Sequence, residues 1–347
     1  MQGTYNMSRP TKREVVTEAL SFRQPPYVPW AWTMTQGCAE RMKASLGGAD
    51  RLDPFIDSHF FEIEPVNGRF EKVDATHVRD TYGVIWDRSV DRDIGVPVEW
   101  PIKRPEDLRR YEWPDVARDD LYGGVAEAFA SHPHMLRRYQ VGFSLYERAW
   151  TMRGMTDLLM DMVARPEFVE ELLDRIVESN LRQVRKALTF QIDAVYFGDD
   201  YGMQTGLIMA VEHWRHFFKP RLARMFAPVR EAGKFAMLHS CGRVTDIFDD
   251  LVEVGLNCFN PFQPEVMDVF AIKKKYHGRL AFHGGMSIQK VLPFGTPAEV
   301  RAATQRLLDA GRPGGYIFSP AHAVPGDVPP ENLIAMMEVI RSQPGCA

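Results

Sequence analysis

Short apolar segments recur along this chain, and segments with a helical pattern separate most of them. The eight segments are VPWAWTM (28–34), HFFEIEP (59–65), YQVGFS (139–144), AVYFGDD (194–200), FAMLHSC (235–241), CFNPF (258–262), LAFHGGM (280–286) and YIFSPAH (316–322). Each has the length and apolar character of a buried strand. Strands that alternate with helices form a parallel sheet with helical crossovers. The alternation therefore predicts an α/β fold, and eight strands favour a closed TIM-type (β/α)8 barrel over an open doubly wound sheet.

The segments between the strands complete this picture. Helices are predicted at 155–162, 166–188, 211–232, 244–254, 297–310 and 330–341. An N-terminal helix is predicted at 11–22, where Thr11 and Glu14 have the spacing of a capping box. The polar stretch 66–113 breaks the alternation, and we interpret it as an insertion or rim segment. Since no internal repeat or linker divides the chain, residues 1–347 are expected to form one barrel domain with an N-terminal helical extension.

Composition excludes several classes of protein. Hydrophobic residues make up 45% of the 347 residues and charged residues 25%, which is typical of a globular protein. The net charge of −4 argues against nucleic-acid binding, and no apolar run approaches the roughly 20 residues that span a membrane. The N-terminus has no secretory signal, and four cysteines are too few for a disulfide framework. We therefore expect a cytoplasmic enzyme.

Residues that can do chemistry gather at the ends of the predicted strands. They are Asp199, Asp200, His239, Cys241, Gln263, Glu265, His283 and His322. In a barrel of parallel strands, functional residues occupy the C-terminal strand ends. His239 and Cys241 are two residues apart on an extended backbone, so both side chains point to one face and can bind one zinc ion.

Each of these residues also has a structural interpretation. Cysteine is often buried as a small apolar residue, and histidine often satisfies a local hydrogen bond. The pair Asp199 and Asp200 is consistent with a helix cap as well as with a site. Cys258 lies inside an apolar run and is expected to be a packing residue. Spacing alone leaves these alternatives open.

Long segments resemble the uroporphyrinogen decarboxylase superfamily over nearly the whole chain. They include YGVIWD, YFGDDYGMQTGLIM, HSCGRVTDIFDDLVEVGLNCFNPFQPE, RLAFHGGMSIQKVLPFGTPAEV and GGYIFSPAHAVPGDVPPENLIAM. The resemblance implies a TIM-type barrel with its active-site cleft at the C-terminal ends of the strands. One branch of the superfamily decarboxylates uroporphyrinogen. Other members are methyltransferases that work with corrinoid proteins and use zinc to activate a thiol acceptor.

Two departures from the decarboxylase branch follow from the same comparison. That branch carries an arginine-rich loop of the type MRQAGRY after its first strand, whereas WTMTQGCAERM here has no arginine before Arg41. Trp150 stands at the position of its active-site tyrosine, although its histidine matches His322. Arginine would supply the charge complement to a substrate with many carboxylates. We therefore expect that this chain does not decarboxylate uroporphyrinogen.

The methyltransferase branch matches better. It uses His-x-Cys and a distant Cys as zinc ligands, and the resemblance places His239 and Cys241 at the first two positions. His322 stands where the second Cys would be, and imidazole is a competent zinc ligand. The cobalamin-independent methionine synthases, which look distantly similar, add a Glu ligand between the Cys and the last ligand. Glu265 or Gln263 lies in that region.

The leading interpretation is a methyltransferase of one-carbon metabolism that uses zinc and a corrinoid carried by a partner protein. The methyl donor or acceptor would be a small molecule. The residues assigned to this site are Asp199, Asp200 and His322 as catalytic groups, Trp32, Trp150, Gln204 and His283 as substrate contacts, and His239, Cys241, His322 and Glu265 as metal ligands.

The alternative is a metal-free carboxy-lyase that acts on another aromatic or pyrrolic acid, with His322 as proton donor. A third is a non-catalytic protein that holds a corrinoid or tetrapyrrole. Homo-oligomers are possible.

Overall fold

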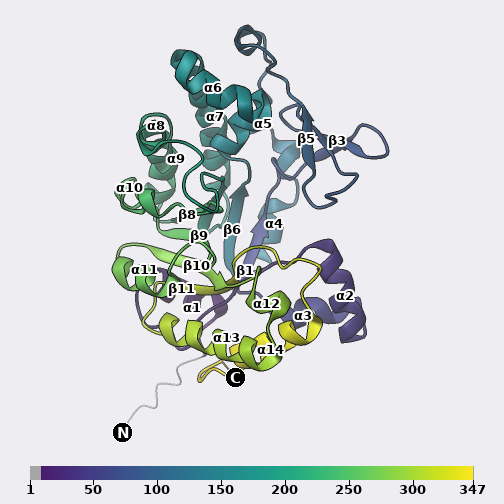
Figure 1. Ribbon diagram of the computed structural model, residues 1–347, viewed down its shortest axis with the longest axis vertical. Helices are drawn as coiled ribbons and strands as arrows, with labels where there is room; N and C mark the ends of the chain where they lie inside the picture. Colours follow the sequence, from purple (N-terminus) through teal and green to yellow (C-terminus); the bar gives the residue numbers. More distant parts are fainter. Residues whose placement is uncertain (1–8, 347) are drawn as a thin grey trace.

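Seven parallel strands form the central sheet of the computed structural model, which describes residues 9–346. In sheet order they are β1 (Phe60–Ile63), β6 (Leu136–Val141), β7 (Ala194–Gly198), β8 (Phe235–His239), β9 (Cys258–Phe262), β10 (Ala281–Met286) and β11 (Tyr316–Pro320). The strands follow each other in the order of the chain, and the sheet is curled with helices outside it (Figure 1). The predicted α/β fold with a parallel sheet is therefore confirmed, and each of these strands overlaps a predicted one.

The first predicted strand differs from the prediction. Segment 28–34 forms only isolated parallel bridges, from Trp30 to Phe318 and from Met34 to Val324. On its other side, the N–H of His59 donates to the carbonyl of Trp30 at 3.0 Å. The segment thus lies between β11 and β1 without joining a regular ladder. The two bridges are four residues apart on this segment (34 − 30) and six apart on the neighbouring one (324 − 318), so no regular ladder connects them, and the sheet has seven regular strands rather than eight.

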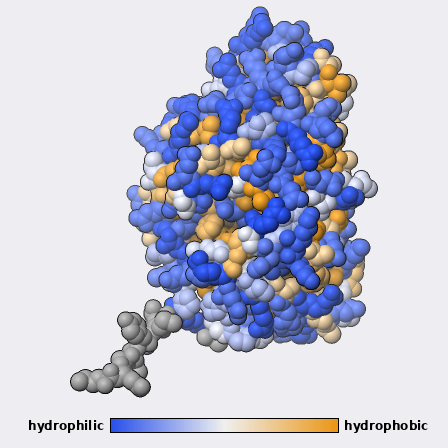
Figure 2. All heavy atoms as spheres, turned by 90° about the vertical axis from the view of Figure 1, so that its left-hand side faces the viewer, coloured by the Kyte–Doolittle hydropathy of each residue, from blue (hydrophilic) through white to orange (hydrophobic). Residues whose placement is uncertain are grey.

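Helices connect the strands and cover the outside of the sheet (Figure 1). They are α1 (Lys12–Leu20), α2 (Gln36–Leu46), α3 (Leu52–Ile56), α4 (Val125–Ala130), α5 (Tyr146–Arg153), α6 (Met155–Ala164), α7 (Pro166–Ala187), α8 (Val211–Phe217), α9 (Lys219–Glu231), α10 (Phe248–Glu253), α11 (Val269–Tyr276), α12 (Val291–Phe294), α13 (Pro297–Gly311) and α14 (Pro330–Arg341). Figure 2 shows that the face over α8 to α11 carries mainly hydrophilic side chains. None of the helices in residues 9–346 is long and apolar enough to cross a membrane.

Two helix predictions can be compared with the structure in detail. The capping box is confirmed, since the Thr11 side chain accepts from the Glu14 N–H and the Glu14 carboxylate accepts from the Thr11 N–H. The single helix predicted at 211–232 is wrong, because α8 ends at Phe217 and α9 begins at Lys219. Pro220 stands in the first turn of α9, where it cannot donate to the preceding turn, so the helix breaks before it.

An apolar layer fills one end of the space inside the curled sheet. It consists of Ala31, Phe60, Leu136, Ala194, Met237, Cys258, Ala281 and Ile317, with Val16 and Leu20 of α1 packed against them. Cys258 is fully buried in this layer, as expected for a packing residue. Ala31 and Phe60 also line the cavity described below, so this layer forms the floor of the cavity. The N-terminal helix therefore closes one end of the fold.

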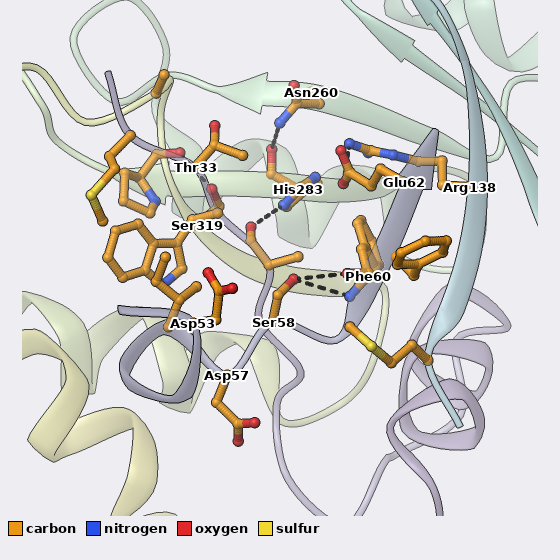
Figure 3. A pocket seen from close by; sticks show the side chains of 18 of the residues that line it. Thr33, Asp53, Asp57, Ser58, Phe60, Glu62, Arg138, Asn260, His283 and Ser319 are labelled. Carbon is orange, nitrogen blue, oxygen red and sulfur yellow. Dashed lines mark hydrogen bonds and ion pairs between the residues drawn. The ribbon is translucent and has the colours of Figure 1, made fainter. Parts of the chain in front are cut away.

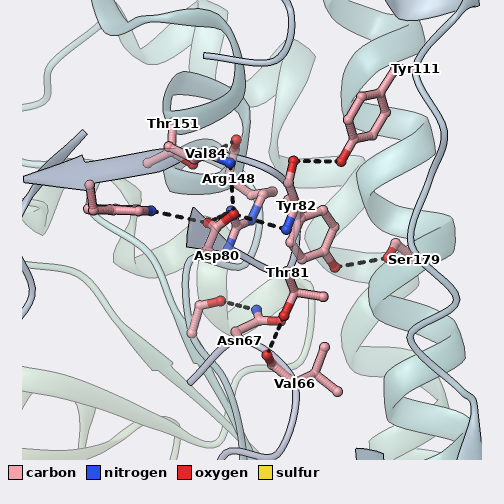
Figure 4. Close-up of polar contacts among 12 residues, drawn as sticks. Val66, Asn67, Asp80, Thr81, Tyr82, Val84, Tyr111, Arg148, Thr151 and Ser179 are labelled. Carbon is pink, nitrogen blue, oxygen red and sulfur yellow. Dashed lines mark hydrogen bonds and ion pairs between the residues drawn. The ribbon is translucent and has the colours of Figure 1, made fainter. Parts of the chain in front are cut away.

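The predicted insertion is a small antiparallel sheet. Its strands are β2 (Phe70–Lys72), β3 (His77–Asp80), β4 (Ile85–Asp87) and β5 (Val96–Glu99), in that order. Asp80 connects this sheet to α5, because its Oδ2 accepts from Arg148 at 2.6 Å and its Oδ1 accepts from the N–H groups of Tyr82 and Val84 (Figure 4). The side chains of Asp80 and Arg148 are 2% and 1% exposed. A buried ion pair thus holds the insertion against the main body.

Candidate functional site

Three donor side chains meet at the C-terminal ends of two strands. His239 is the last residue of β8, Cys241 follows it by two positions, and His322 lies two positions after β11. One donor atom from each residue lies within 4.8 Å of the other two. The Nε2 of His239 is 3.3 Å from the Sγ of Cys241, and the two imidazole rings are 5.6 Å apart between centroids. The structure therefore brings together three of the four residues predicted to bind one metal, and Glu265 is not among them.

The spacing of these atoms is close to that of a tetrahedral zinc site. Ligands at about 2.0–2.3 Å from a tetrahedral ion lie roughly 3.3–3.8 Å from one another. The distance between His239 Nε2 and Cys241 Sγ falls within this range, and the His322 donor atom lies within 4.8 Å of both. Burial raises the pKa of the Cys241 thiol, and the neighbouring Asp200 and Glu147 carboxylates raise it further. A bound cation would offset the effect of these carboxylates.

Hydrogen bonds to Asn260 determine which nitrogen of His239 faces the cluster. The Asn260 amide nitrogen donates to the carbonyl of His283 at 3.0 Å, so its Oδ1 faces Tyr196 and His239. An amide oxygen only accepts, so the His239 Nδ1, 2.8 Å away, carries the hydrogen. The Nε2 lone pair then points to Cys241. This is the arrangement in which outer partners orient metal-ligating histidines.

The two adjacent aspartates have different roles. Asp200 Oδ1 is 3.5 Å from His239 Nε2 and accepts from the Cys241 N–H at 2.6 Å, so it lies beside the cluster. Asp199 is fully buried and does not join it. Its carboxylate accepts from the N–H groups of Tyr146 and Glu147, at the start of α5, and from the Tyr201 hydroxyl. Burial raises the pKa of Asp199 to about 6. Asp199 is thus a long-range helix cap rather than the predicted catalytic group.

A cavity of about 1070 Å³ extends from the cluster, large enough for a small organic molecule. Part of its lining is apolar, with Trp32, Met34, Leu52, Phe60, Phe61 and Met135. The rest is polar or charged and includes Glu62, Arg138, Gln140, Tyr196, Asn260 and His283, His239 and His322 from the cluster, and Lys12, Thr33, Asp53, Asp57, Ser58, His132 and Ser319. Figure 3 shows Glu62 beside Arg138, with His283 and Asn260 next to them.

Two of the predicted substrate contacts line this cavity. Trp32 belongs to the apolar part of the cavity lining, and the residue is 5% exposed. His283 is buried, and its Nε2 donates to the carbonyl of Ala31 at 2.7 Å. Burial lowers the pKa of His283 to about 3, so the imidazole is neutral and its Nδ1 is an acceptor.

The other predicted residues are elsewhere. Trp150 packs against the core from α5, and Gln204 is exposed in the loop after β7; neither lines the cavity. Glu265 accepts from the Ser287 hydroxyl and also lies outside the cavity lining and the donor cluster. Gln263 accepts from the Gly242 N–H at 3.1 Å and so supports the loop that carries Cys241. For Glu265 and Gln263, the hydrogen-bond partner is more than 20 residues away in the chain, so the sequence alone did not show where these side chains lie.

Several polar cavity residues were not predicted from the sequence, and four of them occupy similar places. Glu62, Arg138, Tyr196 and Asn260 lie inside strands rather than at their ends. Glu62 and Arg138 are direct neighbours on β1 and β6. Polar residues inside otherwise apolar strand segments are the signal that would have found them, because a buried polar group needs a partner or a ligand.

Comparison with known proteins identifies the family and the fold. The family model described as uroporphyrinogen decarboxylase (URO-D) matches residues 90–343. Uroporphyrinogen decarboxylases from Methylococcus capsulatus and Chlorobaculum tepidum are 22% and 21% identical, over 69% and 72% of both chains. A methyltransferase from Methanosarcina mazei has a similar structure, with a TM-score of 0.73 and 15% identity, over 95% of this chain and 98% of that one. At this identity, the last match shows a shared fold.

Proposed function

This chain belongs to the uroporphyrinogen decarboxylase family, and we propose that within it the chain is a methyltransferase of one-carbon metabolism that binds zinc through His239, Cys241 and His322. The observation that carries the proposal is the meeting of two imidazoles and one thiol at the end of a cavity large enough for a small substrate. The Cys241 thiol lies 3.3 Å from His239 Nε2, the imidazole nitrogen that faces away from Asn260.

The donor set fits zinc by its chemistry. Catalytic zinc sites use three protein ligands of nitrogen, sulfur or oxygen and leave one position open. When bound, zinc acts as a Lewis acid that lowers the pKa of a thiol or hydroxyl acceptor. Glu265 accepts from Ser287 and lies outside the donor cluster, so His239, Cys241 and His322 are the residues that would hold the ion.

The chain's own residues define the rest of the reaction. The methyl group passes from the donor to the sulfur or oxygen of the acceptor. The acceptor loses the proton of its thiol or hydroxyl, and the donor keeps the electron pair of the bond to the methyl group that breaks. Asp200 lies beside the cluster, is partly exposed, and can accept this proton. We propose a corrinoid on a partner protein, or a small methylated molecule, as the donor. The apolar part of the cavity lining keeps water from the transferred methyl group.

The zinc content of untagged protein tests the proposal first. We expect about one zinc ion per chain and methyl transfer from methylcobalamin to a small thiol. Protein that remains free of zinc after gentle purification, and that cannot be loaded with it, would contradict the proposal and favour the metal-free lyase.

Uroporphyrinogen decarboxylation is expected to be absent. Arg41 does not line the cavity, and its guanidinium donates to the carbonyl of Gly326 instead. Trp150 lies outside the cavity, and His322 joins the donor cluster. The loop that carries Arg41 therefore contributes no arginine to the cavity to neutralise several substrate carboxylates. Incubation with uroporphyrinogen should release no carbon dioxide above the buffer level, and turnover near that of a true decarboxylase would show this interpretation to be wrong.

Replacing Asn260 by leucine is expected to weaken zinc binding by roughly 10- to 100-fold, the usual effect of losing an outer partner of a ligating histidine. The substitution removes the acceptor that keeps the hydrogen on His239 Nδ1. Competition with a coloured chelator measures the change. Asn257→Leu is the matched control, because Asn257 accepts from the Ala236 N–H and lies outside the site. Equal zinc affinity in both variants would argue against the positioning role of Asn260.

A further inference from the structure

The polar part of the cavity lining contains a buried guanidinium that is only partly paired. The Arg138 side chain is 7% exposed, and its Nη2 donates to Glu62 at 2.6 Å. Its Nε and Nη1 have no hydrogen-bond partner within residues 9–346. The guanidinium carbon lies 4.0 Å from the centre of the Tyr196 ring and 4.8 Å from that of Phe60. Arg138 is therefore held between two aromatic rings, with donors left over.

Other unpaired polar atoms surround the same cavity. In the part of the chain that the structure describes, the Nδ1 of His283 and the Nε1 of Trp32 also have no partner, and both residues are 5% exposed. Leaving a buried donor or acceptor unpaired costs about 1–3 kcal/mol for each group. Three residues with this property line one cavity. A bound ligand with polar groups of its own would satisfy them.

We propose that Arg138 anchors a carboxylate of the substrate. The substrate is then a small carboxylic acid, and its carboxylate binds at Arg138. Its other end carries the reacting sulfur or oxygen, which lies at His239, Cys241 and His322; this second assignment rests on the proposed function. Tyr196 spans the two ends, because its ring contacts Arg138 and its hydroxyl lies 2.9 Å from His239 Nδ1. Trp32 and Phe60 surround the apolar body of the molecule.

The surroundings of Arg138 favour a carboxylate over other groups. Aromatic rings contact the guanidinium, so a ligand approaches its edge, where Nη1 and the second hydrogen of Nη2 present two parallel N–H groups to the two oxygens of a planar carboxylate. Glu62 takes only one hydrogen of Nη2. A doubly charged phosphate would be repelled more strongly by Glu62 than a singly charged carboxylate. His283 is neutral and has used its single N–H, so it offers an acceptor for a hydroxyl or N–H of the same substrate.

Binding of matched acids and amides tests the anchor. The probes are the three methoxybenzoates and 3-(methylthio)propionate, each compared with its uncharged amide by calorimetry on the full chain. At least one acid should bind 10-fold or more tightly than its amide. Arg138→Met should remove this preference and leave amide binding unchanged, because the methionine replaces the apolar stem of the arginine. If no acid binds more tightly than its amide, or if Arg138→Met keeps the preference, the anchor is wrong.

Glu62→Gln provides a second, opposite test. The substitution removes the carboxylate that competes for Arg138, and the new amide side chain retains a carbonyl oxygen for Nη2. We expect acids to bind several-fold more tightly and amides to bind as before. A loss of acid binding in this variant would contradict the anchor even if Arg138→Met failed to fold.

Zinc content separates this inference from the proposed function. Arg138 and Glu62 do not belong to the donor cluster, so both variants should contain as much zinc as the wild type. A wild type that prefers acids but binds no zinc would retain the anchor and lose the methyltransferase proposal. A wild type that binds zinc but does not prefer acids would retain the methyltransferase proposal and lose the anchor.

Discussion

Replacing Cys241 by alanine is expected to lower zinc affinity by more than about 100-fold and to abolish methyl transfer. Outer-sphere partners of ligating histidines are worth about 10- to 100-fold, and loss of a direct ligand exceeds that. Cys241 supplies the only sulfur of the cluster, while His239 and His322 alone leave a weak two-nitrogen site. Zinc analysis after dialysis, together with the rate of methyl transfer from methylcobalamin, measures the effect.

Cys258→Ala is the matched control for this substitution. Cys258 is fully buried in the apolar layer below the cavity, so its replacement removes one sulfur without touching the cluster. We expect unchanged zinc content and a small loss of stability, because a buried atom is removed. Equal zinc content in wild type and Cys241→Ala would refute the ligand role of Cys241 and with it the proposed zinc site.

Replacing Asp80 by alanine is expected to reduce the free energy of unfolding by about 3–5 kcal/mol, the typical cost of leaving a buried charge without its partner. Arg148, 1% exposed, would lose the carboxylate to which it donates. The N–H groups of Tyr82 and Val84 would also lose their acceptor. Urea unfolding measured by circular dichroism gives the change.

The double variant Asp80→Ala with Arg148→Met separates charge from packing. Since this variant has no uncompensated charge, it should recover part of the stability that Asp80→Ala loses. A single variant that loses less than about 1 kcal/mol would show that water or another acceptor reaches Arg148, and that the ion pair does not hold the insertion in place.

The amino-acid sequence determined the elements that depend on local pattern. Apolar runs between helical segments predicted the seven strands of the parallel sheet, because a strand buried on both faces must be apolar. The capping box at Thr11 and Glu14 was readable because its two residues are three positions apart. His239, Cys241 and His322 were readable as well, since strand ends of a parallel sheet meet on one side.

Tertiary structure decided which polar residues face which partner. Asp199 and Asp200 are adjacent in the sequence, yet one caps α5 and the other lies beside His239, because neighbouring residues point in different directions from a strand end. Asn260 and Arg138 enter the cavity from within strands, and only the packed sheet shows that their partners are His239 and Glu62. Such contacts join residues far apart in the chain, and their energies depend on burial, which no local pattern contains.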